Sequence, residues 1–129
     1  MAAMHHLVYL SHATEALDAR RLDELLEVAR RKNAALGITG LLIHRGGNFI
    51  QYLEGEEAVV RRVYATICAD PRHSGTTVLS EGPIAQRRFG DWAMNFRQSD
   101  GRAIFTEAEL RDDSDGILTL LQGFSQNLR

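Results

Sequence analysis

Several residue types are scarce in this chain, and each shortage excludes a class of protein. The single cysteine, Cys68, cannot form an intrachain disulfide or a zinc site of the Cys-x-x-Cys type. No apolar stretch approaches the roughly 18 residues that a membrane-spanning helix needs. The N-terminal segment MAAMHHLVYL also lacks the basic start of a signal peptide. We therefore expect a protein of the reducing cytoplasm that has no membrane partner.

Charge and histidine patterns narrow the choice of partner further. Fifteen basic residues stand against seventeen acidic ones, a formal net charge of −2 at pH 7, which argues against nucleic acid as the main partner. Five histidines are present, but His5 and His6 are adjacent on an expected strand and point to opposite faces. No HxxxH or HExxH pairing occurs, so we expect no metal site.

What the chain does have is the composition of one globular domain. It has 129 residues, 44% of them hydrophobic and 25% charged, which suffices for one core that folds alone. We expect the first helix to fray near Lys32 and Asn33, before Gly37. The expected elements are a strand over residues 4–10, a helix carrying Leu22, Leu25, Leu26 and Ala29, two strands joined by a turn at 45–48, a helix that starts near 56–57 and ends at Pro71, and strands near 78–79 and 92–96.

This order predicts an α+β fold, a ferredoxin-like βαββαββ sheet with two helices on one face. The strands are apolar on both sides, so something must also cover the second face. One candidate is a C-terminal helix that packs on the sheet, and the other is a partner subunit. The apolar side of such a helix consists of Ile117, Leu118, Leu121, Phe124 and Leu128.

The segment GNFIQYLEG places an amide among apolar side chains. Strand alternation puts Phe49, Gln51 and Leu53 on one face. If the first and third strands are adjacent, Tyr9 points to the same side and its hydroxyl can bond the Gln51 amide. The commonest meaning of such residues is a satisfied core network, because buried polar groups are usually hydrogen-bonded to the protein. The amide also has groups left for the edge of a ligand.

Six separated segments resemble those of BLUF domains, the blue-light sensors that use flavin. They are LVYLS, KNAALGITGLL, FIQYLEG, DPRHS, PIAQRRF and DWAM, and they lie between residues 4 and 97. The resemblance implies a photosensor domain over residues 1–97 and a C-terminal helical extension over 98–129. It also implies a non-covalently bound flavin, FAD by first choice, with FMN or riboflavin as possibilities.

The resemblance assigns the polar edge of the flavin to three residues. Tyr9, Gln51 and Asn33 are the tyrosine, glutamine and asparagine of the family's motifs. A flavin edge carries carbonyl and ring-nitrogen acceptors and one imide N–H, so it needs both donors and acceptors, and amides supply both. The family's mechanism implies that light moves an electron and a proton from Tyr9 to the flavin, and that Gln51 then rearranges and changes its hydrogen bond to the flavin.

Further positions match by motif, each beside a plainer structural explanation. Leu25 and Ile67 correspond to aliphatic residues on either side of the flavin ring, and both also suit ordinary helix core. Lys32 and Thr66 depart from the residues common in relatives, and they leave the choice among FAD, FMN and riboflavin open. The remaining candidates are Asp70, Arg72 and His73 as flavin contacts and Ser11, Trp92 and Met94 as modulating residues, of which either Trp92 or Met94 approaches the glutamine.

The sequence thus predicts a photoreceptor rather than an enzyme. Its signal would pass to an unidentified downstream protein, and homo-oligomers are expected by analogy with the family. One alternative is an interaction module that has this fold but binds no flavin. A second is an acylphosphatase-like enzyme, which needs a glycine-rich loop with an arginine after the first strand. The segment LSHATEAL has neither feature.

Overall fold

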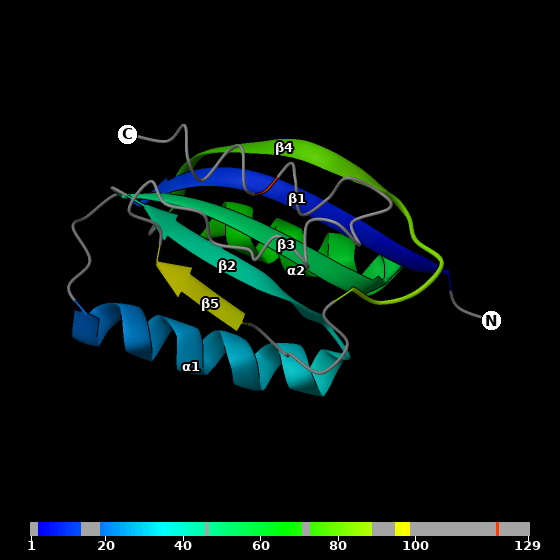
Figure 1. Cartoon of the computed structure of the whole chain (residues 1–129), viewed down its shortest axis with the longest axis horizontal. Coiled ribbons are helices and arrows are strands. Elements are labelled where there is room, and N and C mark those ends of the chain that lie inside the picture. Colours follow the sequence, from blue (N-terminus) through cyan, green and yellow to red (C-terminus); the bar gives the residue numbers. More distant parts are fainter. Residues whose placement is uncertain are drawn as a thin grey trace, which may run out of the picture.

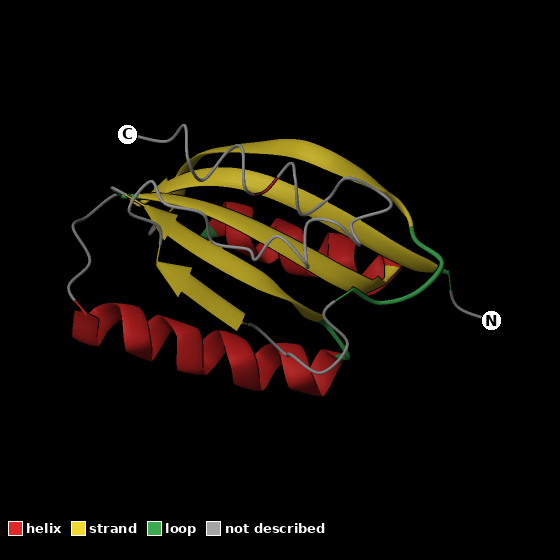
Figure 2. Cartoon of the chain, in the orientation of Figure 1, coloured by secondary structure: helices red, strands yellow, loops and turns green. Residues whose placement is uncertain are grey.

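The fold is known from a computed structural model, which describes residues 3–13, 19–45, 47–70, 73–88 and 95–98 together with Leu121. In these residues a five-stranded sheet carries two helices (Figures 1 and 2). The elements are β1 (Met4–Ala13), α1 (Ala19–Leu36), β2 (Thr39–Arg45), β3 (Asn48–Glu56), α2 (Glu57–Ala69), β4 (His73–Pro83) and β5 (Asn95–Gln98). The predicted βαββαββ order is confirmed.

The strand order in the sheet is β4-β1-β3-β2-β5. All neighbouring strands are antiparallel except β5, which runs parallel to β2. The hairpin predicted between the second and third strands is present, since Arg45 and Asn48 are paired across a two-residue connection. The first and third strands are adjacent, as the expected contact between Tyr9 and Gln51 requires.

Both helices pack on one face of the sheet. Strand alternation sends Leu7, Phe49 and Leu53 to this side, where they form one buried cluster with Leu26 of α1 and Val60 of α2. Burial of such apolar surface stabilises the fold by about 25 cal/mol per Å² and is the main force that holds the helices on the sheet. The helices lie along opposite edges of this face, α1 near β2 and α2 behind β1 and β3 (Figure 1).

The far face of the sheet has a second apolar cluster. Val8, Leu41, Ile50 and Tyr52 are buried there together with Leu121 from the C-terminal region. Leu121 is helical and 0% exposed. The other residues proposed for the C-terminal helix lie outside the described part of the chain.

The far face also buries a carboxylate. Glu54 is 0% exposed. Its oxygens accept hydrogen bonds from the Tyr52 hydroxyl at 3.1 Å, the Thr39 hydroxyl at 2.7 Å and the backbone N–H of Arg88 at 2.6 Å. Such a set of donors offsets the cost of taking a charged group out of water.

The end of α1 differs from the sequence-based expectation. The helix does not fray at Lys32 and Asn33 but continues to Leu36. The backbone N–H of Ile38 bonds the Asn33 carbonyl at 2.8 Å, and that of Gly37 bonds the Ala34 carbonyl at 3.3 Å. This pair of bonds, with Gly37 at φ 71°, is a Schellman cap. The two alanines and the leucine that follow Asn33 favour helix. The helix therefore continues past Asn33 and ends at Gly37, which adopts the left-handed conformation.

Candidate functional site

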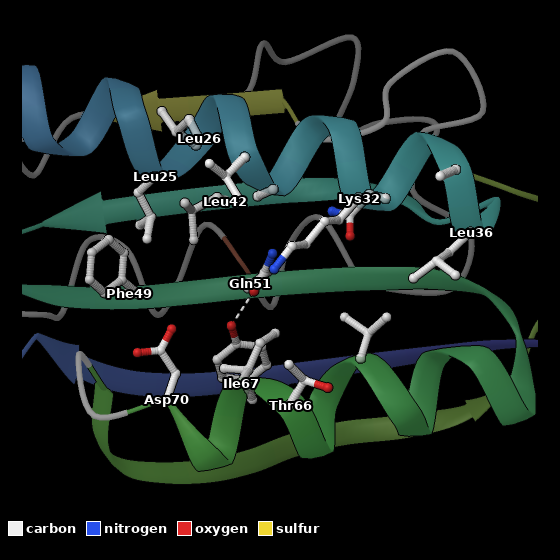
Figure 3. A pocket seen from close by; sticks show the side chains of 16 residues that line it. Leu25, Leu26, Lys32, Leu36, Leu42, Phe49, Gln51, Thr66, Ile67 and Asp70 are labelled. Atoms are coloured by element: carbon white, nitrogen blue, oxygen red, sulfur yellow. Dashed lines mark hydrogen bonds between the residues drawn. The ribbon is translucent and has the colours of Figure 1, made fainter.

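A cavity of about 420 Å³ lies between the two helices and the sheet. Figure 3 shows α1 on one side, α2 on the other and Gln51 of β3 at the floor between them. The lining residues are Tyr9, Leu25, Leu26, Val28, Ala29, Lys32, Asn33, Ala35, Leu36, Leu42, Phe49, Gln51, Val63, Thr66, Ile67 and Asp70. Among them are seven of the twelve residues that the sequence proposed for the site.

Tyr9 and Gln51 form a hydrogen-bonded pair on the cavity floor. They are direct partners in the β1–β3 register, so their side chains leave the sheet side by side. The Tyr9 hydroxyl donates to the Gln51 carbonyl Oε1, the bond drawn as a dashed line in Figure 3. Both residues are buried, at 1% and 6% exposure. The hydrogen bond that the sequence predicted between Tyr9 and Gln51 is therefore confirmed.

Burial keeps the Tyr9 phenol in its protonated form. Removal from water raises the pKa of Tyr9 well above its ordinary value, because the charged phenolate loses its hydration. The ring of Tyr64 on α2 packs against that of Tyr9, with centroids 5.4 Å apart and planes tilted by 53°. Tyr9 is thus a neutral donor, held in place from α2 and directed at Gln51.

Asn33 brings a third polar group to the cavity. It lies in the last turn of α1, is 4% exposed, and lines the cavity. The Schellman cap at Gly37 keeps the helix intact past this position, so Asn33 is presented from a regular helix rather than from a frayed end. The three polar residues singled out by the sequence are therefore brought to one cavity from β1, β3 and α1.

The walls of the cavity are mostly aliphatic. Leu25 on α1 and Ile67 on α2, the two aliphatic residues that the sequence proposed for the faces of the ring, both line it. Val28 and Leu36 line it as well, although they are 45% and 42% exposed. These two were not predicted as site residues, but continuing the helical spacing of α1 past Leu25 would have found them. Large apolar side chains left open to solvent beside a cavity are a mark of a ligand site.

The structure places only some of the other proposed residues at the cavity. Lys32 and Asp70 line the cavity. Ser11 is buried on β1 but does not line the cavity. His73 begins β4, and nothing is described of its side chain. Arg72, Trp92 and Met94 lie outside the described residues.

The residues of this cavity fit a flavin. Its volume falls in the range of about 300–1,000 Å³ that is usual for ligand pockets. A flat tricyclic ring needs apolar walls on both sides, and Leu25 and Ile67 supply them from facing helices. Its polar edge needs donors and acceptors at one place, and the amides of Asn33 and Gln51 can act as both.

Comparison with known proteins assigns the family. The family described as "BLUF: Sensors of blue-light using FAD" matches residues 4–95, well over half of the chain. The chain belongs to the BLUF family. It is therefore a blue-light sensor domain that uses flavin, and the resemblance seen in the six sequence motifs is confirmed.

Curated relatives of this BLUF chain are much longer than it is. The blue light- and temperature-regulated antirepressor BluF of Escherichia coli (strain K12) is 36% identical over 88 residues, 68% of this chain and 22% of that protein. The photoactivated adenylate cyclase subunit beta of Euglena longa is 37% identical over 93 residues, 70% of this chain and 11% of the relative. The chain thus spans between a tenth and a quarter of each of these relatives.

Solved structures of BLUF proteins have the same fold. BlrB in its dark state has a TM-score of 0.73 at 30% identity, with 98% of this chain and 90% of BlrB covered. Klebsiella pneumoniae BlrP1 with FMN and cyclic diGMP has a TM-score of 0.81 at 32% identity, with 96% of this chain and 35% of BlrP1 covered. The BlsA ground state has a TM-score of 0.73 at 26% identity, with 89% and 87% covered.

Two other kinds of feature are absent from the described part of the BLUF chain. No group of three or more histidine, cysteine, aspartate or glutamate side chains there could hold a metal ion. Neither described helix is long and apolar enough to cross a membrane.

Proposed function

We propose that Tyr9 and Gln51 are the light-sensitive pair of this sensor and that their hydrogen bond sets its dark state. The observation that carries the proposal is the bond itself, made between two buried side chains on the floor of a cavity that fits flavin. A change in this bond alters the hydrogen-bond donors presented to the cavity. Light would thus shift the protein between two arrangements of one network without turnover of a substrate.

The two residues have complementary parts in this switch. When bound, flavin supplies the absorption of blue light and an acceptor for an electron and a proton. Tyr9 is the residue that gives up the electron and its phenolic proton, which burial otherwise holds firmly at the hydroxyl. Gln51 accepts the Tyr9 bond at Oε1. By rotation or tautomerism it exchanges the group that faces Tyr9, and its bond toward the cavity changes with it.

Other cavity residues hold the ligand in this proposal. Asn33 pairs with the polar edge of the ring, and Leu25 and Ile67 enclose its two faces. Lys32 and Asp70 contact the more polar part of the flavin. The proposed contacts of the remaining site residues are unchanged: Arg72 and His73 at the flavin edge, and Ser11, Trp92 and Met94 as modulators of the pair.

The far face of the sheet is the route that we propose for the output signal. We propose that the signal leaves through the far face of the sheet and the C-terminal extension, residues 98–129, and passes to a downstream protein, with homo-oligomers as the assembled form. Support comes from Leu121, which packs into the far-face cluster with Tyr52, the neighbour of Gln51 on β3. Gln51 is therefore adjacent in the sequence to a residue that shares a buried cluster with the C-terminal region.

The purified protein provides the test. A flavin sensor should be yellow, and its light-minus-dark absorption spectrum should show a small shift to the red that reverses in darkness. A colourless preparation that takes up no added flavin would favour the alternative, an interaction module with this fold but no chromophore. A yellow protein with a flat difference spectrum would leave flavin binding in place and contradict the switch.

A further inference from the structure

Arg87 holds the C-terminal end of α1 from a distant part of the chain. Its Nη2 atom donates to the Gly37 carbonyl at 2.7 Å, across 50 residues of sequence. The carbonyl groups around a helix C-terminus lack partners within the helix and carry partial negative charge. The last turn of α1 has no basic residue of its own. Arg87 therefore supplies the cation that this helix end lacks.

A second acceptor fixes the direction of the same guanidinium group. Arg87 Nη1 donates to the Thr39 hydroxyl at 2.9 Å, and that hydroxyl donates to Glu54 Oε2 at 2.7 Å. A guanidinium carries its donors in a rigid planar fork, so two bonds in different directions define its orientation. The Arg87 side chain is therefore joined through Thr39 to the buried carboxylate of β3 while it holds the end of α1.

Gly55 of β3 also restricts the position of this helix end. A Cβ atom at Gly55 would lie 3.1 Å from the Gly37 carbonyl oxygen and 2.8 Å from the Ile38 side chain. Only glycine leaves room for so close an approach. Because the Gly37 carbonyl contacts β3 closely and accepts a bond from Arg87, the turn that follows α1 has one defined position.

The last turn of α1 forms part of the cavity. Asn33, Ala35 and Leu36 all line it, and Figure 3 shows Leu36 at the end of α1 beside the opening. Asn33 lies four residues before Gly37, and its carbonyl accepts the capping bond from the backbone N–H of Ile38. A shift of Gly37 would therefore move the Asn33 backbone and, with it, the Asn33 amide.

We propose that Arg87 is the positioning residue for Asn33: by holding Gly37 it fixes where the Asn33 amide meets the polar edge of the flavin. Arg87 is not among the described residues that line the cavity, so it acts through α1 rather than by touching the ligand. An amide that is already held in place loses less conformational freedom on binding, which raises affinity. The inference rests on the proposed function, which assigns the flavin edge to Asn33.

The test is a double-mutant cycle on flavin affinity, with FAD titrated into the full chain freed of flavin and binding followed by fluorescence. Asn33→Ala and Arg87→Met should each weaken binding by about tenfold, the size of one lost hydrogen bond. The double variant should bind within about twofold of Asn33→Ala, because Arg87 then has no amide to position. Independent contributions would instead multiply to a loss of about a hundredfold.

Two further variants separate positioning from a general loss of structure. Arg87→Lys keeps the charge but not the fork of donors, and should weaken binding by only about threefold. Arg61→Met on α2 removes a cation that lies 3.3 Å from Glu57, and should leave the FAD affinity unchanged. If Arg87→Met does not fold, the cycle is run with Arg87→Lys, whose loss should likewise vanish in the Asn33→Ala background.

The outcomes separate this inference from the function on which it rests. A loss in Asn33→Ala together with unchanged affinity in Arg87→Met would overturn the inference alone. Losses that multiply in the double variant, or an equal loss in Arg61→Met, would also overturn it, since Arg87 would then act only on the stability of the fold. Unchanged affinity in Asn33→Ala would instead contradict the flavin contact assigned to Asn33 in the proposed function.

Discussion

Each face of the sheet contains a polar residue of β3 among large apolar side chains, but the hydrogen-bond surroundings of the two residues differ. On the far face, the Glu54 carboxylate is surrounded by donors from Tyr52, Thr39 and the Arg88 backbone. On the helix face, Gln51 accepts from Tyr9 and borders an open cavity. The far-face group is enclosed by protein, whereas the helix-face group adjoins space for a ligand.

This difference shows how a buried polar residue can be assigned a role. Glu54 is the costlier group to bury, being a potential charge, and by that measure alone it would be the stronger candidate for chemistry. Its three donors account for its burial without a ligand. Gln51 becomes the better candidate because its neighbours leave a cavity with apolar walls and polar groups converging at one place.

The largest effect should come from removing the Tyr9 hydroxyl on the helix face, and removal of the Tyr52 hydroxyl on the far face is its control. Tyr9→Phe should abolish the red-shifted state while flavin remains bound, because the phenolic proton and its bond to Gln51 are gone. Tyr52→Phe removes an equally buried hydroxyl, the one bonded to Glu54, and should keep the full light response. The measurement is the light-minus-dark spectrum at equal flavin content, and a full red shift in Tyr9→Phe would show that another donor suffices.

Removing the far-face carboxylate should affect stability rather than light response. Glu54→Leu removes the acceptor of three hydrogen bonds, which are donated by Tyr52, Thr39 and the Arg88 backbone. We expect the free energy of unfolding to fall by about 3 kcal/mol, measured by urea denaturation. An unchanged stability, or the loss of the red shift at equal flavin content, would contradict the distinction between the two faces.

The smallest effect should come from a charged cluster on the helix face away from the cavity. The His5 Nε2 to Glu81 Oε2 distance is 3.1 Å, and Arg61 lies 3.7 Å from Glu81. The hydrogen bond with His5 is the main cause that lowers the pKa of Glu81 below its usual 4.5. A lowered carboxyl pKa stabilises the folded state above the unfolded value of 4.5 and loses that contribution as pH falls through the folded value.

Glu81→Gln should therefore lower the free energy of unfolding at pH 7 by less than about 1 kcal/mol, as exposed ion pairs usually do. The difference from the wild type should shrink to zero below the folded pKa of Glu81. The red shift should be unaffected, because Glu81 does not line the cavity. Thermal unfolding of both proteins between pH 3 and 7 measures this, and a difference that grows toward low pH would contradict the assignment.

The sequence predicted the order of helices and strands and the hydrogen bond between Tyr9 and Gln51, for physical reasons. Period-two alternation decides which side chains share a face, so Tyr9 and Gln51 could be placed together once β1 and β3 were assumed adjacent. The helical spacing of Leu25 likewise placed it on the buried side of α1. The identity of the ligand did not follow from these periodicities and came from the motif resemblance.

The features that the sequence missed depend on a local helix cap and on contacts between distant segments. The end of α1 was misplaced because the Schellman cap at Gly37 outweighs the weak helix propensity of Asn33. The burial of Glu54 depends on Arg88, which is 34 residues away in the chain. Helical spacing places Val28 and Leu36 on the same side of α1 as Leu25, but the cavity that they border forms only once α2 is placed opposite α1.

The most direct test of the central claim is the light-minus-dark absorption spectrum of Gln51→Leu beside that of the wild type at matched flavin occupancy. Leucine fills similar space but cannot accept the Tyr9 bond or donate toward the cavity. The account predicts a reversible red-shifted difference band in the wild type and a flat spectrum in the variant, with flavin still bound. The same band in both proteins would contradict the assignment of Gln51 as the switch.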